Sequence, residues 1–144
     1  MKLLFDTSVL VATMVQRHDA HERAFPWLER VVRGSDQGVV SAHTIAELYA
    51  VLTTLPLRPI LQPHAVRELI EHNVISQMEV VTLARNDYID VLDHLVEQSL
   101  TGGITYDALI AWVARKSEVD RVVTLNPKDF KRVLPLLGDK VIVP

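Results

Sequence analysis

Short apolar runs that alternate with helical patterns are the feature that most constrains the fold of this chain. Strands that are buried on both faces are typically continuous apolar runs, without the polar alternation of a half-exposed strand. Strands that alternate with helices form a parallel sheet covered by helices on both faces. The sequence therefore predicts an α/β fold with a central, mostly parallel sheet, whose strands are residues 3–5, 39–40, 80–83, 122–125 and 141–143.

Helices are predicted between these strands. Asp19 and Glu22 match the first and last positions of a capping box, from which a helix would run toward Gly34. Pro26 would kink or break that helix. Apolar residues at helical spacing predict further inner faces: Ile45, Leu48, Tyr49 and Leu52; Val66, Leu69, Ile70 and Val74; and Tyr88, Val91, Leu92, Leu95 and Val96.

Composition favours one soluble domain over residues 1–144, which is long enough to bury a core. A net charge of −3, from 15 basic and 18 acidic residues, argues against a protein that coats nucleic acid through a basic surface. The chain has no cysteine, so disulfides, thiol catalysis and thiolate zinc sites are excluded, and a cytoplasmic location is expected. No apolar run reaches the length of a membrane span.

Three carboxylates stand alone in apolar segments. Asp6 lies within residues 3–11, Glu47 within residues 45–52 and Asp107 within residues 104–113, and none of these segments contains Lys or Arg. Burying a carboxylate is costly unless it is paired, hydrogen-bonded or bound to a metal. We therefore expect the missing positive charge to be a divalent cation, whose preferred ligands are carboxylate oxygens and water.

The predicted topology would gather acidic groups at one edge of the sheet. Ligands of parallel sheets lie outside the carboxyl ends of the strands. Asp6 follows the first strand, and Asn126 and Asp129 follow the fourth. Glu47 and Asp107 lie near the starts of helices that could point toward the same edge.

Four segments resemble, in order and spacing, the motifs of PIN-domain nucleases over nearly the full length of the chain. They are FDTSVL at residues 5–10, AEL at 46–48, TYDALIA at 105–111 and TLNPKDF at 124–130. One departure is Asn126, which stands where many relatives carry a further acid. The short chain also looks like a VapC-type toxin of a toxin–antitoxin pair. The resemblance implies a three-layer α/β/α PIN-like domain.

The resemblance further implies an Mg²⁺- or Mn²⁺-dependent endoribonuclease that cuts single-stranded regions of cellular RNA, such as transfer or ribosomal RNA. A cognate VapB-like antitoxin would block its site, and a homodimer is expected. Bound Mg²⁺ lowers the pKa of its water and polarises the phosphoryl group. The implied catalytic residues are Asp6 and Asp107 as direct metal ligands, with Glu47 and Asp129 ordering waters or a second ion.

Polar and basic neighbours of these acids are candidates for supporting roles. The hydroxyls of Thr7, Ser8 and Thr124 could orient a carboxylate or touch the scissile phosphate, and Asn126 could act through its amide or a bound water. Cations that could hold RNA, or could equally be solvated surface charge, are Arg115, Lys116, Lys128, Lys131 and Arg132, with Arg17 and Arg23 as weaker candidates.

Other interpretations are open on sequence grounds. Asp6 and Asp129 could simply cap helices, and Asp107 could be a favourable charge in a first turn. An aspartate-based phosphatase would need a second Asp two residues after Asp6, where Ser8 stands. A catalytically silent PIN-like module that binds RNA or protein is a further alternative. Residues 52–61 could accept an antitoxin helix or a second subunit, or be a turn packed on its own core.

Two histidine pairs have ligand-like spacing. His18 is followed by His21, and His43 by Glu47. Neither pair has a convincing third partner, so zinc is not proposed.

Overall fold

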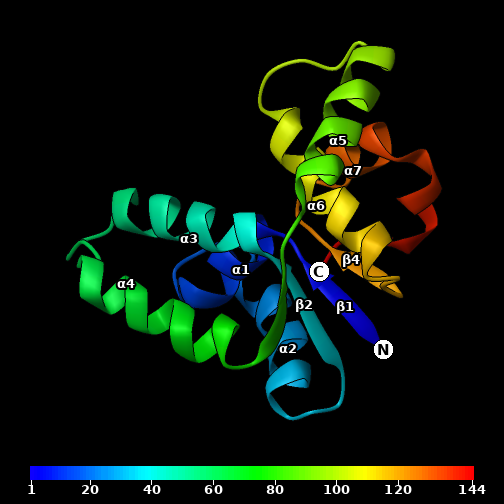
Figure 1. The fold of residues 1–144 in the computed structure, drawn as a ribbon. Coiled ribbons are helices and arrows are strands. Elements are labelled where there is room, and N and C mark those ends of the chain that lie inside the picture. Colours follow the sequence, from blue (N-terminus) through cyan, green and yellow to red (C-terminus); the bar gives the residue numbers. More distant parts are fainter.

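A fully parallel sheet runs through the centre of the molecule (Figure 1). The computed structural model describes residues 1–144. Its strand order is β3-β2-β1-β4-β5, which confirms the predicted α/β class. The strands are β1 (Lys2–Phe5), β2 (Gln37–Ser41), β3 (Met78–Val81), β4 (Arg121–Val123) and β5 (Val141–Ile142).

Helices cover both faces of this sheet, as the sequence predicts. One face carries α1 (Thr7–Met14), α2 (His21–Val32), α3 (Ala42–Thr54) and α4 (Pro63–Ile70), which a π-helical turn (Glu71–Ile75) extends. The other face carries α5 (Arg85–Glu97), α6 (Ile104–Lys116), α7 (Pro127–Val133) and a 3-10 helix (Pro135–Lys140). Figure 1 shows the two groups of helices on opposite sides of the strands. No helix combines the length and the apolar character needed to cross a membrane.

The side chains of β1 explain why its sequence is a continuous apolar run. Leu3 and Phe5 pack in the cluster formed with α1 to α4, and Leu4 packs in the cluster formed with α5 to α7. All three side chains are fully buried. Successive side chains of a strand point to opposite faces, so a strand between two helical layers needs apolar residues at every position.

The predicted capping box at Asp19 is wrong. Helix α2 begins at His21 with Ala20 at its N-cap and no side-chain capping bond. The ring of His18 binds the N-cap residue instead, because its Nδ1 accepts from the Ala20 N–H at 3.1 Å. Pro26 lies inside α2 and does not end it, since buried residues before and after it hold the helix on the core.

The inner face predicted for α5 is only half buried. Val91 and Leu95 are buried, whereas Tyr88, Leu92 and Val96 are exposed. Helix α5 lies at the outside of the molecule and packs mainly on α6, so only part of its apolar face is covered.

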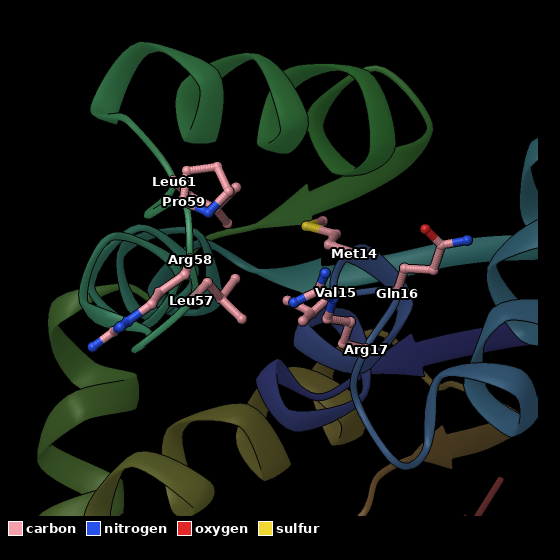
Figure 2. Close-up of a pocket in the computed structure, with 8 residues that line it drawn as sticks. All are labelled: Met14, Val15, Gln16, Arg17, Leu57, Arg58, Pro59 and Leu61. Carbon is pink, nitrogen blue, oxygen red and sulfur yellow. The ribbon is translucent and has the colours of Figure 1, made fainter.

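The connection between α3 and α4 packs on its own domain. Leu57, Pro59 and Leu61 border a hollow of about 310 Å³, across which lie Met14 at the end of α1 and Arg17 in the turn after it (Figure 2). Leu57 and Leu61 also contact the core cluster. Residues 52–54 belong to α3, and for residues 55–61 this contact favours the interpretation as a turn on its own core.

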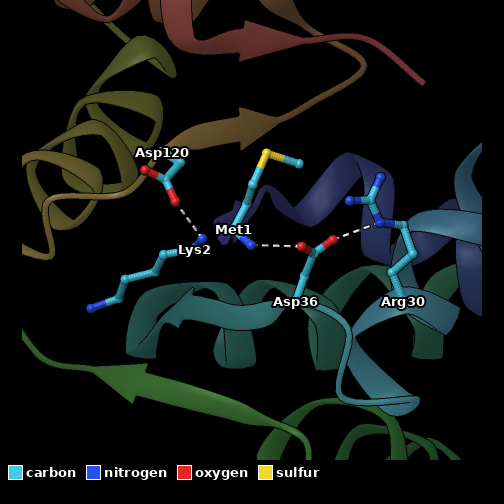
Figure 3. A network of polar contacts seen from close by, with 5 residues as sticks. All are labelled: Met1, Lys2, Arg30, Asp36 and Asp120. Carbon is cyan, nitrogen blue, oxygen red and sulfur yellow. Dashed lines mark hydrogen bonds and ion pairs between the residues drawn. The ribbon is translucent and has the colours of Figure 1, made fainter.

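A polar network ties the amino ends of the strands together (Figure 3). The Asp36 carboxylate binds the Met1 amine at 2.7 Å and Nε of Arg30 at 2.6 Å. Asp120 accepts from the backbone N–H of Lys2 at 2.7 Å. The N-terminal amine and Arg30 hold the pKa of Asp36 below its usual value. This network lies at the edge of the sheet opposite the carboxyl ends of the strands.

Candidate active site

The carboxyl end of β1, the turn after β4, the first turns of α1 and α6 and the middle of α3 surround one cleft of about 420 Å³. Asp6, Glu47 and Asp107 all line it. Thr7, Ser8 and Asn126 line it as well. The fold therefore brings the three isolated carboxylates of the sequence to the same place.

Asp6 is buried directly after β1, with 3% of its surface exposed. Its Oδ2 accepts hydrogen bonds from Thr124 Oγ1, at 2.8 Å, and from Ser8 Oγ. Burial raises the pKa of Asp6, and the two hydroxyls partly oppose that rise. The side chain makes no capping bond to α1, so a simple helix cap does not explain this residue.

The same two hydroxyls join the turn after β4 to the turn after β1. Ser8 Oγ accepts from the Leu125 N–H at 3.1 Å, and Thr124 Oγ1 accepts from the Asn126 N–H at 2.9 Å. Both hydroxyls thus accept from backbone N–H groups of the turn after β4 and donate to Asp6. These bonds fix the orientation of the Asp6 carboxylate relative to that turn.

Glu47 is held at the cleft by α1 and by its own helix. Thr7 Oγ1 donates to Glu47 Oε2 at 2.7 Å. His43, one turn earlier on α3, places its Nε2 3.6 Å from Glu47 Oε1. Ser41 caps α3 by accepting from the His43 N–H at 3.2 Å, so this helix starts directly after β2 and brings Glu47 to the edge of the sheet.

Asp107 lies in the first turn of α6, where the charges of the other acids act on it. Burial raises its pKa to about 7, together with repulsion from Asp6, Asp129 and Glu47. The four acids are therefore close enough to act on one another. No Lys or Arg forms an ion pair with any of them, and the one basic side chain paired with an acid here is His43, beside Glu47.

The fourth acid is placed differently from the other three. Asp129 lies in the first turn of α7 and is not among the residues that line the cleft, whereas Asn126 is. Asp129 acts on Asp107 through its charge. Asn126 therefore lines the cleft itself, and Asp129 lies outside the lining but near enough for its charge to raise the pKa of Asp107.

None of the five basic candidates lines the cleft. Arg115 and Lys116 end α6, about 12 Å along the helix from Asp107 at the usual rise per residue. Arg115 lies over the Trp112 ring at 4.3 Å from its centroid, and Lys116 Nζ binds Asp87 at 2.7 Å. Lys128, Lys131 and Arg132 are exposed on α7.

The cleft also contains residues that sequence reasoning missed. His18 and Tyr106 line it, and His43 touches Glu47. The spacing of His43 and Glu47, one helical turn apart, was the feature of the sequence that could have placed His43 at the site. His18 and His21 do not converge, because the His21 ring contacts the Ala12 carbonyl at 2.9 Å. No group of three His, Asp or Glu side chains is close enough to ligate one ion together.

This chain matches a family model and named relatives over most of its length. The PIN domain family model matches residues 3–134. Ribonuclease VapC40 of Mycobacterium tuberculosis is 39% identical over 114 residues, which are 76% of this chain and 76% of VapC40. Ribonuclease VapC27 of the same organism is 28% identical over 118 residues, covering 82% of this chain and 80% of VapC27.

A solved structure shares the fold. VapBC2 of Rickettsia felis, bound to a DNA fragment from its promoter, superposes with a TM-score of 0.66 at 19% identity, over 100% of this chain and 98% of the other.

Proposed function

Because this chain belongs to the PIN-domain family, we propose that it is a metal-dependent endoribonuclease that hydrolyses RNA phosphodiester bonds. The observation that carries the proposal is the single cleft that Asp6, Glu47 and Asp107 all line, without a Lys or Arg paired to any of them. The names of the relatives VapC40 and VapC27, both ribonucleases, support the same activity.

The donor set of the cleft fits a divalent cation. Asp6 and Asp107 are the proposed direct ligands, and Glu47 and Asp129 would hold coordinated waters. Mg²⁺ keeps several of its own waters and binds proteins through one or two carboxylates. Two direct ligands are therefore enough, although no three acids are in reach of one ion. Mg²⁺ or Mn²⁺ is proposed, because carboxylate and water ligands suit both.

The chain's own residues orient and tune the site. When bound, the ion lowers the pKa of a coordinated water and polarises the phosphoryl group. Ser8 and Thr124 fix the Asp6 carboxylate, and Thr7 fixes Glu47. With its pKa near 7, Asp107 must lose a proton before it can serve as a ligand. Without the ion, the acids repel the phosphates of RNA, so substrate binding and cleavage both depend on it.

We further propose that this chain acts as the toxin of a toxin–antitoxin pair. Likeness to VapC proteins at 39% and 28% identity supports this role. A VapB-like antitoxin is the proposed partner, RNA is the substrate, and a homodimer and a cytoplasmic location are expected. Lys128, Lys131 and Arg132 on α7 are the proposed contacts to RNA phosphates, since they are exposed and follow the fourth motif.

One assay tests the activity against its alternatives. Purified protein is incubated with RNA and with a chromogenic phosphatase substrate, each with Mg²⁺ or with chelator. RNA cleavage that is lost in chelator supports the nuclease. Turnover of the chromogenic substrate indicates a phosphatase, and RNA binding without cleavage indicates a silent module; either outcome contradicts the proposal.

Matched variants assign the chemistry to the cleft. Asp6→Asn and Asp107→Asn are expected to abolish cleavage while the fold is retained, as judged by circular dichroism. The control is Asp90→Asn, which changes an exposed acid on α5 and should leave cleavage unchanged. Full activity in either cleft variant would refute the assigned roles. Sequencing of RNA ends from cells expressing wild type or Asp6→Asn would identify the target.

A further inference from the structure

An aromatic pair stands at the edge of the cleft, beside the acids. Tyr106 immediately precedes Asp107 in the first turn of α6, and His43 lies in the first turn of α3. Their rings are stacked, with centroids 5.0 Å apart and planes inclined by 7°. Tyr106 lines the cleft and is 51% exposed.

The stack holds the Tyr106 ring in place while leaving much of it open to solvent. His43 is itself fixed, because its backbone N–H donates to Ser41 and its ring lies against Glu47. The tyrosine is therefore neither a core residue nor a freely rotating surface residue. The other two tyrosines, Tyr49 and Tyr88, are similarly exposed but do not border the cleft.

We propose that Tyr106, backed by His43, is a stacking platform for a base of single-stranded RNA beside the scissile phosphate. This inference rests on the proposed nuclease function and adds a residue that holds the substrate. Aromatic rings stack on unpaired bases of any sequence, because every base has a π-face. Tyr106 adjoins Asp107 in the chain, so a base on this ring would keep its phosphate close to the acids.

The charge distribution explains why such a platform is needed. The cleft is acidic and none of its lining residues is Lys or Arg. Arg115 and Lys116, on the same helix as Tyr106, are engaged at its far end. The cleft's own side chains therefore offer no cationic contact to phosphate, and stacking provides affinity that does not depend on charge.

A binding experiment tests the platform independently of cleavage. Tyr106→Leu and Tyr106→Phe are made in the Asp6→Asn background, which is expected to bind RNA without cutting it, because Asn removes a metal ligand and also one of the charges that repel phosphate. Tyr88→Leu in that background is the matched control, because it removes an equally exposed ring at a distance from the cleft. The probes are a short single-stranded RNA carrying 2-aminopurine and an abasic oligomer with the same number of phosphates, each in Mg²⁺.

Stacking predicts a loss that depends on the base. Tyr106→Leu should weaken binding of the RNA by about tenfold or more and abolish the quenching of 2-aminopurine, with no change for the abasic oligomer. Tyr106→Phe should retain both affinity and quenching, and Tyr88→Leu should match the unchanged background. Unaltered RNA binding by Tyr106→Leu, or an equal loss for both oligomers, would overturn the proposal.

Different results would refute the stacking role of Tyr106 and the nuclease activity. If otherwise wild-type protein cleaves RNA and Tyr106→Leu does so with unchanged KM, the nuclease stands and the platform is refuted. If base-dependent binding is lost in Tyr106→Leu but wild type never cleaves RNA, the platform stands and the nuclease is refuted.

Discussion

Replacing Asp107 with Asn is expected to stabilise the metal-free protein above pH 7, although it removes a proposed metal ligand. The pKa of Asp107 is raised from 3.8 to about 7 by burial and by the neighbouring acids. Between these values the native state binds more protons than the unfolded state. The free energy of unfolding therefore falls as pH rises through this window, and the penalty is complete above pH 7.

The size of the effect follows from the pKa. A rise from 3.8 to about 7 corresponds to roughly 4 kcal/mol, at about 1.36 kcal/mol for each pH unit. Asp107 is partly exposed, and solvent screening reduces this to about 2 kcal/mol. For a domain of this length, about 2 kcal/mol raises the Tm by roughly 4–8 °C.

Thermal unfolding in chelator at pH 5 and pH 8 measures the difference. Asp107→Asn should unfold at a higher temperature than wild type at pH 8, and the gap should shrink at pH 5. Asp90→Asn, an exposed acid on α5, serves as the control with no such gap. If Asp107→Asn is no more stable than wild type at pH 8, this would refute the burial penalty and the repulsion between Asp107 and the other acids, on which the proposed metal site is based.

Three further predictions concern the ion and the groups that support the fold. Mg²⁺ should raise the Tm of wild type more at pH 8 than at pH 5, because protons compete for Asp107; scanning calorimetry would show it, and equal shifts would contradict it. Thr124→Val should lower kcat and cost about 1–2 kcal/mol in urea unfolding, since Asp6 loses a buried hydrogen bond; unchanged kcat would contradict the positioning role. Asp36→Asn should cost about 1–2 kcal/mol at pH 7 with kcat unchanged. That cost should vanish as pH falls through the lowered pKa of Asp36, and a constant cost would contradict the ion pairs.

Local sequence determined the layered architecture of this protein. The apolar runs that became β1 and β2 have no polar alternation, so burial on both faces was predictable without any contact information. The isolation of Asp6, Glu47 and Asp107 among apolar residues was equally visible. The missed cap at Asp19 and the half-exposed face of α5 show the limit of such patterns, because packing partners decide which side of a helix is covered.

Only the tertiary structure decided how the acids are arranged and held. The hydrogen bond from Thr124 to Asp6 joins residues 118 positions apart, and it exists because β4 lies next to β1 in the sheet. The stack of His43 on Tyr106 depends on the approach of α3 to α6. Sequence spacing specifies neighbours within a helix or strand, whereas strand order and helix packing bring distant residues together.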